Sequence, residues 1–188
     1  MNPAVQVVEP TRDIDEAALL ARARDGDAAA VDALVRKYLG DVYAITFRLL
    51  GDRDLAQDAA QDALVGALNG LHRFRGASSF RTWLIRIAIN AARSTGRRKT
   101  RRREVSLEAV AGNADAGVDA ASLVARNDEA ERAAALLDRL PEKQRMAVSL
   151  RIHQGLSYKE IGVALDCTEG AARVNYHLGV KRLRELMT

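Results

Sequence analysis

Residues 157–186 read SYKEIGVALDCTEGAARVNYHLGVKRLREL, and this stretch decides the fold of the C-terminal part of the chain. Ser157 and Glu160 match the S-x-x-E capping box that begins a helix, and apolar residues follow at helical spacing. The pattern then breaks for a short turn, in which Thr168 can cap a second helix that begins at Glu169. Two helices joined by so short a turn predict a helix-turn-helix motif.

The second helix of this motif carries polar side chains that suit nucleic acid. A recognition helix enters the major groove of DNA with its N-terminus first, where the helix dipole also favours a phosphate. Arginine can pair with guanine and asparagine with adenine, while cations farther along meet phosphates. The candidate contacts are Arg173, Asn175, His177, Lys181, Arg182 and Arg184. A helical hairpin that packs only on protein is the alternative.

Residues 72–103, HRFRGASSFRTWLIRIAINAARSTGRRKTRRR, hold eleven Lys and Arg residues and no Asp or Glu. Apolar spacing predicts a helix that Ser78 or Ser79 caps, with one stripe packed inward. The inward stripe is Phe80, Trp83, Leu84, Ile87, Ala88 and Ala91. A second, polar stripe is Thr82, Arg86, Asn90, Arg93 and Arg97.

This basic helix predicts a contact with nucleic acid as well. Cations neutralise phosphates, an asparagine amide can bind a base edge, and aromatic rings can stack on unpaired bases. Aromatic residues occur at Phe74, Phe80 and Trp83, beside the expected start of the helix. The alternative is a solvated basic helix, although solvated faces normally mix charges of both signs.

Three further helices are expected before the basic one, and together the four can bury one core. The first covers about residues 15–23, the second runs from a cap at Asp27 to Gly51, and Asp52 or Asp54 opens the third. On the third helix, Asp58, Gln61 and Asp62 stand at positions i, i+3 and i+4 and form one acidic patch. Such a patch is either a docking face for a protein with basic residues or a solvated surface.

The expected organisation is an all-α fold of two small domains joined by a flexible linker. Residues 1–13 are a tail, 14–103 the first domain, 104–127 the linker and 128–188 the second domain. The linker is rich in Ala, Gly, Asp and Asn and loses helical periodicity. The net charge is −5 over residues 1–71, +11 over 72–103, −6 over 104–131 and +4 over 132–188. Two basic regions separated by acidic ones predict two contacts with a polyanion.

Composition and motifs argue against several classes of function. The single cysteine, Cys167, cannot form an intramolecular disulfide, and the three histidines are too scattered for a metal site. The sequence holds no glycine-rich phosphate loop or nucleophile elbow, so neither a cofactor nor an enzymatic reaction is expected. No apolar run reaches the roughly 18 residues of a membrane span, and no signal peptide is recognisable, so a cytoplasmic protein is expected.

Together these segments resemble a bacterial sigma factor of the extracytoplasmic-function (ECF) group, which has only the second and fourth sigma regions. DAAQDALVGAL (residues 58–68) resembles the helix of that group that binds core RNA polymerase. FRGASSFRTWLIRIAINAARS (74–94) is similar to its promoter-melting segment, and LPEKQRMAVSLRIHQGLSYKEIGVALDCTEGAARV (140–174) to its fourth region. The resemblance covers most of the chain, with both motifs in the expected order.

The resemblance implies a transcription initiation factor, of a stress or envelope-response regulon, with a role for each motif. Asp58, Gln61 and Asp62 would bind the clamp helices of the polymerase β′ subunit. The minus-ten element would be held and melted by Phe74, Arg75, Ser78, Ser79, Thr82, Trp83, Arg86, Asn90, Arg93 and Arg97. The minus-thirty-five element would be read by Thr168, Glu169, Arg173, Val174, Asn175, His177, Lys181 and Arg182. The implied partners are promoter DNA, the clamp helices and β flap of core polymerase, and an anti-sigma protein.

The recognition helix departs from the pattern of that group, which often reads G-T-V-K-S-R-L. Val174 and Asn175 replace a serine and an arginine, and Leu178 stands where an arginine is found downstream. Affinity for the minus-thirty-five element would then depend on Lys181, Arg182 and Arg184.

Two other classes of protein compete with the sigma factor. A stand-alone regulator of the LuxR type can have a similar C-terminal helix-turn-helix, but it does not explain the aromatic and basic helix of the first domain. An enzyme acting on nucleic acid would need a carboxylate or metal constellation, and none is present in the sequence.

Overall fold

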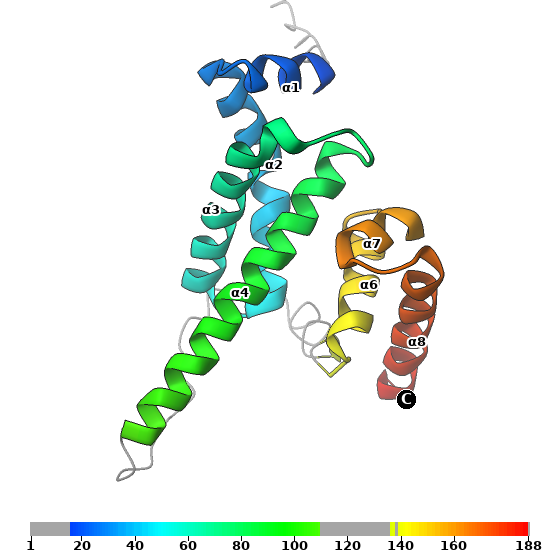
Figure 1. The fold of residues 1–188 in the computed structure, drawn as a ribbon. Helices are drawn as coiled ribbons and strands as arrows, with labels where there is room; N and C mark the ends of the chain where they lie inside the picture. The colour runs from blue at the N-terminus through cyan, green and yellow to red at the C-terminus, as the bar shows by residue number, and fades with distance from the viewer. Residues whose placement is uncertain (1–15, 110–135, 138, 188) are drawn as a thin grey trace, which may run out of the picture. The chain divides into compact units, whose positions relative to one another are not determined.

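The computed structural model describes residues 16–109, 136, 137 and 139–187, with the backbone alone for 102–109. Within these ranges the fold is all-helical, as predicted (Figure 1). The elements are α1 (Glu16–Arg24), α2 (Ala28–Leu50), α3 (Arg53–Gly70), the 3-10 turn η1 (Leu71–Arg73), α4 (Phe80–Ala109), α6 (Glu142–His153), α7 (Tyr158–Leu165) and α8 (Glu169–Met187). The expected tail and most of the expected linker lie outside the described residues.

The described residues form two compact units that divide between Gly40 and Asp41, so α2 contributes to both. In the first unit, Asp27 caps α2 by accepting from the backbone N–H groups of Ala29 and Ala30 at 2.9 and 3.2 Å. Glu16 ties α1 to α2, because its carboxylate accepts from the Tyr38 hydroxyl and lies 2.8 Å from the Lys37 ammonium.

In the second unit, α3 and α4 pack side by side (Figure 1). Asp52 caps α3 by accepting from the Leu55 N–H at 3.1 Å. Asp52 and Asp54 were the two alternatives that the sequence predicted for this cap. The buried residues of α3 are the alanines Ala56, Ala59, Ala60, Ala63 and Ala67. The larger Leu55, Leu64 and Leu68 of the same helix are only half-buried. Small side chains thus form the inner face, where they allow close approach of the neighbouring backbone.

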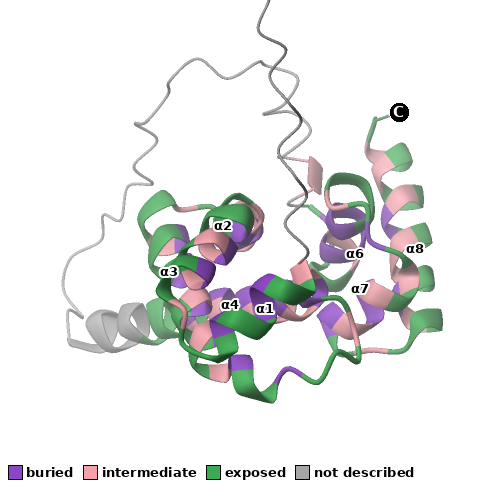
Figure 2. Cartoon of the chain, turned by 90° about the horizontal axis from the view of Figure 1, so that it is seen from above, coloured by how far each residue is buried: buried purple, intermediate pink, exposed green. Residues whose placement is uncertain are grey.

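The buried face of α4 also differs from the expected stripe. Phe80, Leu84 and Ala88 are buried as predicted. The other buried residues of α4 are Ile85, Ile89 and Ala92 together with the polar Thr82 and Thr95, whereas Trp83, Ile87 and Ala91 are half-buried. Figure 2 colours the described residues by burial, with the buried ones in purple and the half-buried ones in pink. The prediction was wrong by part of a turn, because apolar residues fill consecutive positions and permit more than one inward stripe.

Helix α4 continues to Ala109, six residues beyond the boundary expected at 103. The added segment contains Glu, Leu and Ala, which are strong helix formers, and no Gly or Pro. The helix therefore extends into the segment that was expected to be linker.

The C-terminal helices α6, α7 and α8 pack on one another and form the predicted helix-turn-helix. Two glycines make the packing close. A Cβ on Gly162 would lie 2.8 Å from the Cys167 carbonyl oxygen, and one on Gly179 would lie 2.7 Å from a methyl carbon of Val148. Gly162 therefore lets the turn fold back over α7, and Gly179 lets α8 lie against α6.

Candidate nucleic-acid interface

The predicted acidic patch lies on the outer side of α3. Asp58, Gln61 and Asp62 are all exposed, so the structure brings the three together on one surface. Asp62 approaches Arg98 of α4 at 3.4 Å, and both side chains stay about 60 % exposed (60 and 62 %). A groove beside the patch is lined by Asp52, Asp54, Leu55, Asp58, Gln61, Asp62, Thr95, Arg98 and Lys99. The surface can therefore accept a basic partner on its α3 side.

The cap of α3 forms one end of the same groove. Hydrogen bonding from the Leu55 N–H, followed by that from Lys99 at 3.0 Å, holds the pKa of Asp52 below its usual range. The carboxylate is therefore charged at neutral pH and serves the cap and the α3–α4 contact at once.

The loop before α4 turns sharply at Gly76, whose φ of 73° is a left-handed conformation that favours glycine. Ser79 is the cap of α4, since its hydroxyl accepts from the Thr82 N–H at 3.1 Å. Arg75 and Ser79 are exposed and Ser78 is half-buried. The loop thus presents hydroxyls and one cation to solvent.

Phe74 was expected to help hold the minus-ten element. The residue is only 9 % exposed and belongs to the core. It packs on Phe80 and Trp83 with ring centroids 5.5 and 5.3 Å apart. Of the three rings, Trp83 is the most exposed, being half-buried. Phe74 is therefore the buried ring of this aromatic cluster, and Trp83 is the ring that is partly open to solvent.

In the polar stripe of α4, some side chains are exposed to solvent and others are buried or bonded to other residues. Asn90 and Arg97 are exposed, as a contact with DNA requires. Thr82 is fully buried, and its hydroxyl lies 2.8 Å from that of Ser79 and 3.3 Å from the Glu160 carboxylate. In this conformation Thr82 is not open to a nucleic acid.

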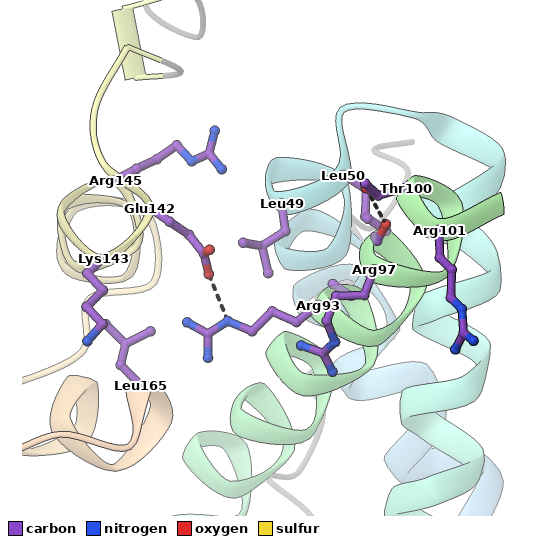
Figure 3. Close-up of a pocket in the computed structure, with 12 residues that line it drawn as sticks. Leu49, Leu50, Arg93, Arg97, Thr100, Arg101, Glu142, Lys143, Arg145 and Leu165 are labelled. Atoms are coloured by element: carbon purple, nitrogen blue, oxygen red, sulfur yellow. Dashed lines mark hydrogen bonds and ion pairs between the residues drawn. The ribbon is translucent and has the colours of Figure 1, made fainter. Parts of the chain in front are cut away.

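Two arginines of the stripe pair with carboxylates of α6 and of the turn between α7 and α8. Arg86 contacts Asp166 at 3.0 Å, and Arg93 contacts Glu142 at 2.8 Å. Figure 3 shows the second pair, with the Arg93 guanidinium directed at the Glu142 carboxylate. The pocket around it is basic, since its other charged residues are Arg97, Arg101, Lys143 and Arg145. A polyanion on α4 must therefore compete with these carboxylates.

Arg81 is a residue of this surface that the sequence did not single out. Its Nε donates to Asp41 at 2.7 Å, its Nη1 donates to the Gln154 carbonyl at 2.9 Å, and its Nη2 donates to the Gln154 side chain. The sequence showed only that Arg81 belongs to the basic run. Its two partners could not be predicted, because both lie far away in the sequence.

The caps of the helix-turn-helix are those that the sequence predicts. The Ser157 hydroxyl accepts from the Glu160 N–H at 3.3 Å, and the Glu160 carboxylate accepts from the Ser157 N–H at 2.8 Å. These hydrogen bonds lower the pKa of Glu160, with the backbone bond from Ser157 as the main cause. Thr168 caps α8 by accepting from the Ala171 N–H at 3.1 Å, and Asp166 takes a left-handed conformation in the turn.

Arg173 is exposed on the first turns of α8 and is held on two sides. Its Nη2 lies 3.1 Å from a Glu169 carboxylate oxygen, one turn earlier. Its guanidinium carbon lies 5.2 Å from the centre of the Tyr158 ring, where Arg151 also approaches at 5.1 Å. These contacts orient the guanidinium at the surface.

The remaining candidates on α8 are placed differently from one another. The Asn175 amide donates to the Ala171 carbonyl at 2.8 Å, so it faces its own helix instead of an adenine. His177 is exposed, with its ring 5.3 Å from that of Tyr176. The other candidates on or next to this helix are also exposed, namely Thr168, Glu169, Val174, Lys181 and Arg182.

Among the described residues, no helix combines the length and apolar character of a membrane span.

Comparisons with known proteins agree with this arrangement. Residues 34–102 match "Sigma-70 region 2" and residues 130–183 match "Sigma-70, region 4". The chain is 35 % identical to the RNA polymerase sigma-H factor of Pseudomonas aeruginosa over 163 residues, covering 82 % of this chain and 84 % of the relative. It is 33 % identical to the ECF RNA polymerase sigma-E factor of Escherichia coli K12 over 165 residues, covering 82 and 85 %. The solved structure of CnrH in complex with the cytosolic domain of CnrY matches with a TM-score of 0.66 and 25 % identity, covering 92 and 96 %.

Fold and sequence therefore define a sigma-70 type protein with a region 2 and a region 4. The chain belongs to the ECF sigma factors, which direct RNA polymerase in transcription initiation and are not enzymes. The match to region 2 accounts for the α3–α4 part of the chain, which a stand-alone LuxR-type regulator leaves unexplained.

Proposed function

We propose that the chain recruits core RNA polymerase through α3 and opens promoter DNA along α4, while α8 reads the minus-thirty-five element. The observation that carries this proposal is the separation of charge on one packed pair of helices. Asp58, Gln61 and Asp62 are exposed on α3, and Asn90 and Arg97 are exposed on α4. Acids that face a protein and cations that face DNA suit a bridge between polymerase and promoter.

The exposed acids of α3 dock on basic residues of the clamp helices of the polymerase β′ subunit. Val65 stands one turn after Gln61 and Asp62 and is 51 % exposed, so the acidic patch has an apolar end. Such a combination of charge and apolar surface is typical of a protein interface. Ile152, exposed near the end of α6, supports a second polymerase contact with the β flap.

The loop at 74–79 and the first turns of α4 receive the non-template strand of the minus-ten element. The Ser78 and Ser79 hydroxyls and Arg75 offer edge and phosphate contacts, and Trp83 offers a stacking surface above the buried Phe74. Asn90, Arg97 and, once released from its carboxylate partner, Arg93 continue the track along the helix.

The protein acts in the cytoplasm, where polymerase and promoter are found, and an anti-sigma protein holds it inactive. The complex of the relative CnrH with the cytosolic domain of CnrY supports a regulating partner of this kind. The acidic patch of α3 and the basic face of α4 are the surfaces that such a partner would have to cover.

Run-off transcription tests the whole proposal. Purified core polymerase is given promoter templates from the source genome, with and without the full-length protein, and discrete transcripts are expected only with it. The variant Asp58→Arg/Asp62→Arg should abolish transcription and co-elution with core polymerase, because it places cations against a basic partner. Asp25→Arg/Asp32→Arg makes the same change of charge in the first unit and serves as the control. Normal co-elution of the α3 variant would refute the docking role.

Single-strand binding tests the opening role separately. The full-length protein should prefer single-stranded minus-ten DNA over the same sequence as duplex, measured by fluorescence anisotropy at moderate salt. Asn90→Ala should reduce that preference. If both forms bound equally and Asn90→Ala had no effect, the opening role would be refuted. The protein would then be interpreted as a duplex-binding regulator.

A further inference from the structure

Gly170 lies in the first turn of α8, and nothing inside the protein requires a glycine there. A Cβ at this position would meet no heavy atom within 4 Å, and its φ is not in the left-handed range. Glycine within a helix costs about 1 kcal/mol relative to alanine. An exposed helix position without a side chain and without an internal reason allows another molecule to approach the backbone closely.

Val174 stands one turn after Gly170 on the same side of α8. Its side chain is 56 % exposed, and it lies on the opposite side of the helix from Ala172, which is fully buried. Leu178, one further turn along, is 48 % exposed. The outer side of the first turns of α8 is therefore an apolar strip, defined as Gly170, Val174 and Leu178.

Charged residues limit the kinds of molecule that fit this strip. Arg173 precedes Val174, and Lys181 and Arg182 follow Leu178, all of them exposed. Cations beside an apolar strip and beyond its C-terminal end suit a polyanion that presents apolar groups between its phosphates. The major groove of DNA does so at each thymine, whose C5 methyl group projects into the groove.

Asn175, the neighbouring candidate for base contact, is turned away from this strip. Its amide donates to the Ala171 carbonyl of its own helix at 2.8 Å. Val174 is therefore the side chain at the centre of the outer surface, where a recognition helix contacts base edges.

We propose that Val174 is a specificity-determining residue that recognises thymine, by packing its methyl groups on the C5 methyl of a base in the minus-thirty-five element. Gly170 lets α8 enter the groove deeply enough for this contact, and Leu178 extends the apolar surface. The inference rests on the proposed function of α8 as the helix that reads duplex DNA.

Replacement of thymine by uracil tests the contact, because uracil lacks only the C5 methyl group. The full-length protein selects duplexes from a pool with a randomised 12-base-pair segment, and the enriched sequence is then synthesised with thymine or with uracil. The wild-type protein should bind the thymine duplex about fourfold more tightly, the factor expected for burial of one methyl group. Val174→Ala should bind both duplexes alike. Its circular dichroism and melting temperature should match the wild type, because Val174 is exposed.

Leu39→Ala is the matched control, since Leu39 is also an aliphatic residue on a helix and is 48 % exposed on α2. It should keep the full preference for thymine. If the wild type bound thymine and uracil duplexes equally, or if Val174→Ala kept the preference, the inference would be wrong while the reading role of α8 stood. If the wild type enriched no sequence at all, the reading role would fail and the inference with it.

Discussion

Helices α4 and α8 both carry cations expected to meet DNA, and the structure holds these cations in different ways. On α4, Arg86 and Arg93 pair with carboxylates from the turn between α7 and α8 and from α6, at 3.0 and 2.8 Å. On α8, Arg173 is held by Glu169 of its own helix and by the Tyr158 ring. A polyanion must therefore displace carboxylates of other elements to reach Arg86 and Arg93, whereas Arg173 is held only by residues on its own side of the helix-turn-helix.

The largest effect is expected from a variant that disrupts the helix-turn-helix and leaves α4 intact. Gly162→Val should destabilise the helix-turn-helix by about 3 kcal/mol, because a Cβ there would lie 2.8 Å from the Cys167 carbonyl. Duplex binding through α8 should be lost, while single-strand binding through α4 persists. Calorimetry and anisotropy measure the two effects. Gly170→Ala is the control for stability alone, since open space at Gly170 predicts no loss of melting temperature. A stable Gly162→Val protein would show that the turn can move.

A smaller effect separates the two kinds of cation on α8 itself. Arg173→Ala should cost about 1–3 kcal/mol on the cognate minus-thirty-five duplex and much less on random duplex. Lys181→Ala should weaken both alike and lower the salt slope by about one. Titrations at several salt concentrations distinguish the two outcomes. Equal losses on specific and random DNA for both variants would make Arg173 a phosphate contact only.

The competition on α4 predicts a gain of binding of a few-fold. Asp166→Asn removes the charge that pairs with Arg86 and keeps a residue that tolerates the left-handed conformation of the turn. Because the pair is exposed, affinity for a single-stranded oligonucleotide should rise only about twofold to threefold. Asp25→Asn, exposed in the turn before α2, should change nothing beyond the loss of one charge. An unchanged or lower affinity for Asp166→Asn would argue against competition by this carboxylate.

The smallest effect concerns the capping box of α7 and its dependence on pH. Hydrogen bonds from Ser157 hold the pKa of Glu160 below its ordinary value of 4.5. The carboxylate therefore contributes stability that is present above pH 4.5 and is lost as the pH falls through the lowered pKa. Glu160→Gln should lower the melting temperature by about 2 °C at pH 7, and the difference should shrink as the pH falls from 7 to below 4.5. Parallel melting curves for both proteins over this range would contradict the assignment.

The sequence predicted the local features of the fold better than the surfaces of its helices. Caps at Asp52, Ser157 and Thr168 are set by residues within one turn, and the structure confirms all three. The inward face of α4 depends on which neighbours pack against it, and consecutive apolar residues such as Leu84 and Ile85 leave that choice open.

The candidate site shows the same division between local and tertiary effects. Exposure of Asp58, Gln61 and Asp62 follows from helical spacing alone. Burial of Phe74 and Thr82 does not, since it results from Trp83 and from Glu160, which is 78 residues away from Thr82. The close approaches at Gly162 and Gly179 likewise leave no periodic signal in the sequence.

The aromatic cluster under the loop before α4 gives the protein an optical reporter of its own. Trp83 is the single tryptophan of the chain, and its ring lies 5.3 Å from that of Phe74 and 5.6 Å from that of Phe80. Excitation at a wavelength that tyrosines do not absorb makes the emission arise from this ring alone. Stacking of a base on the half-buried indole would quench that emission. Strand capture can then be followed in real time on the unlabelled, unmodified protein.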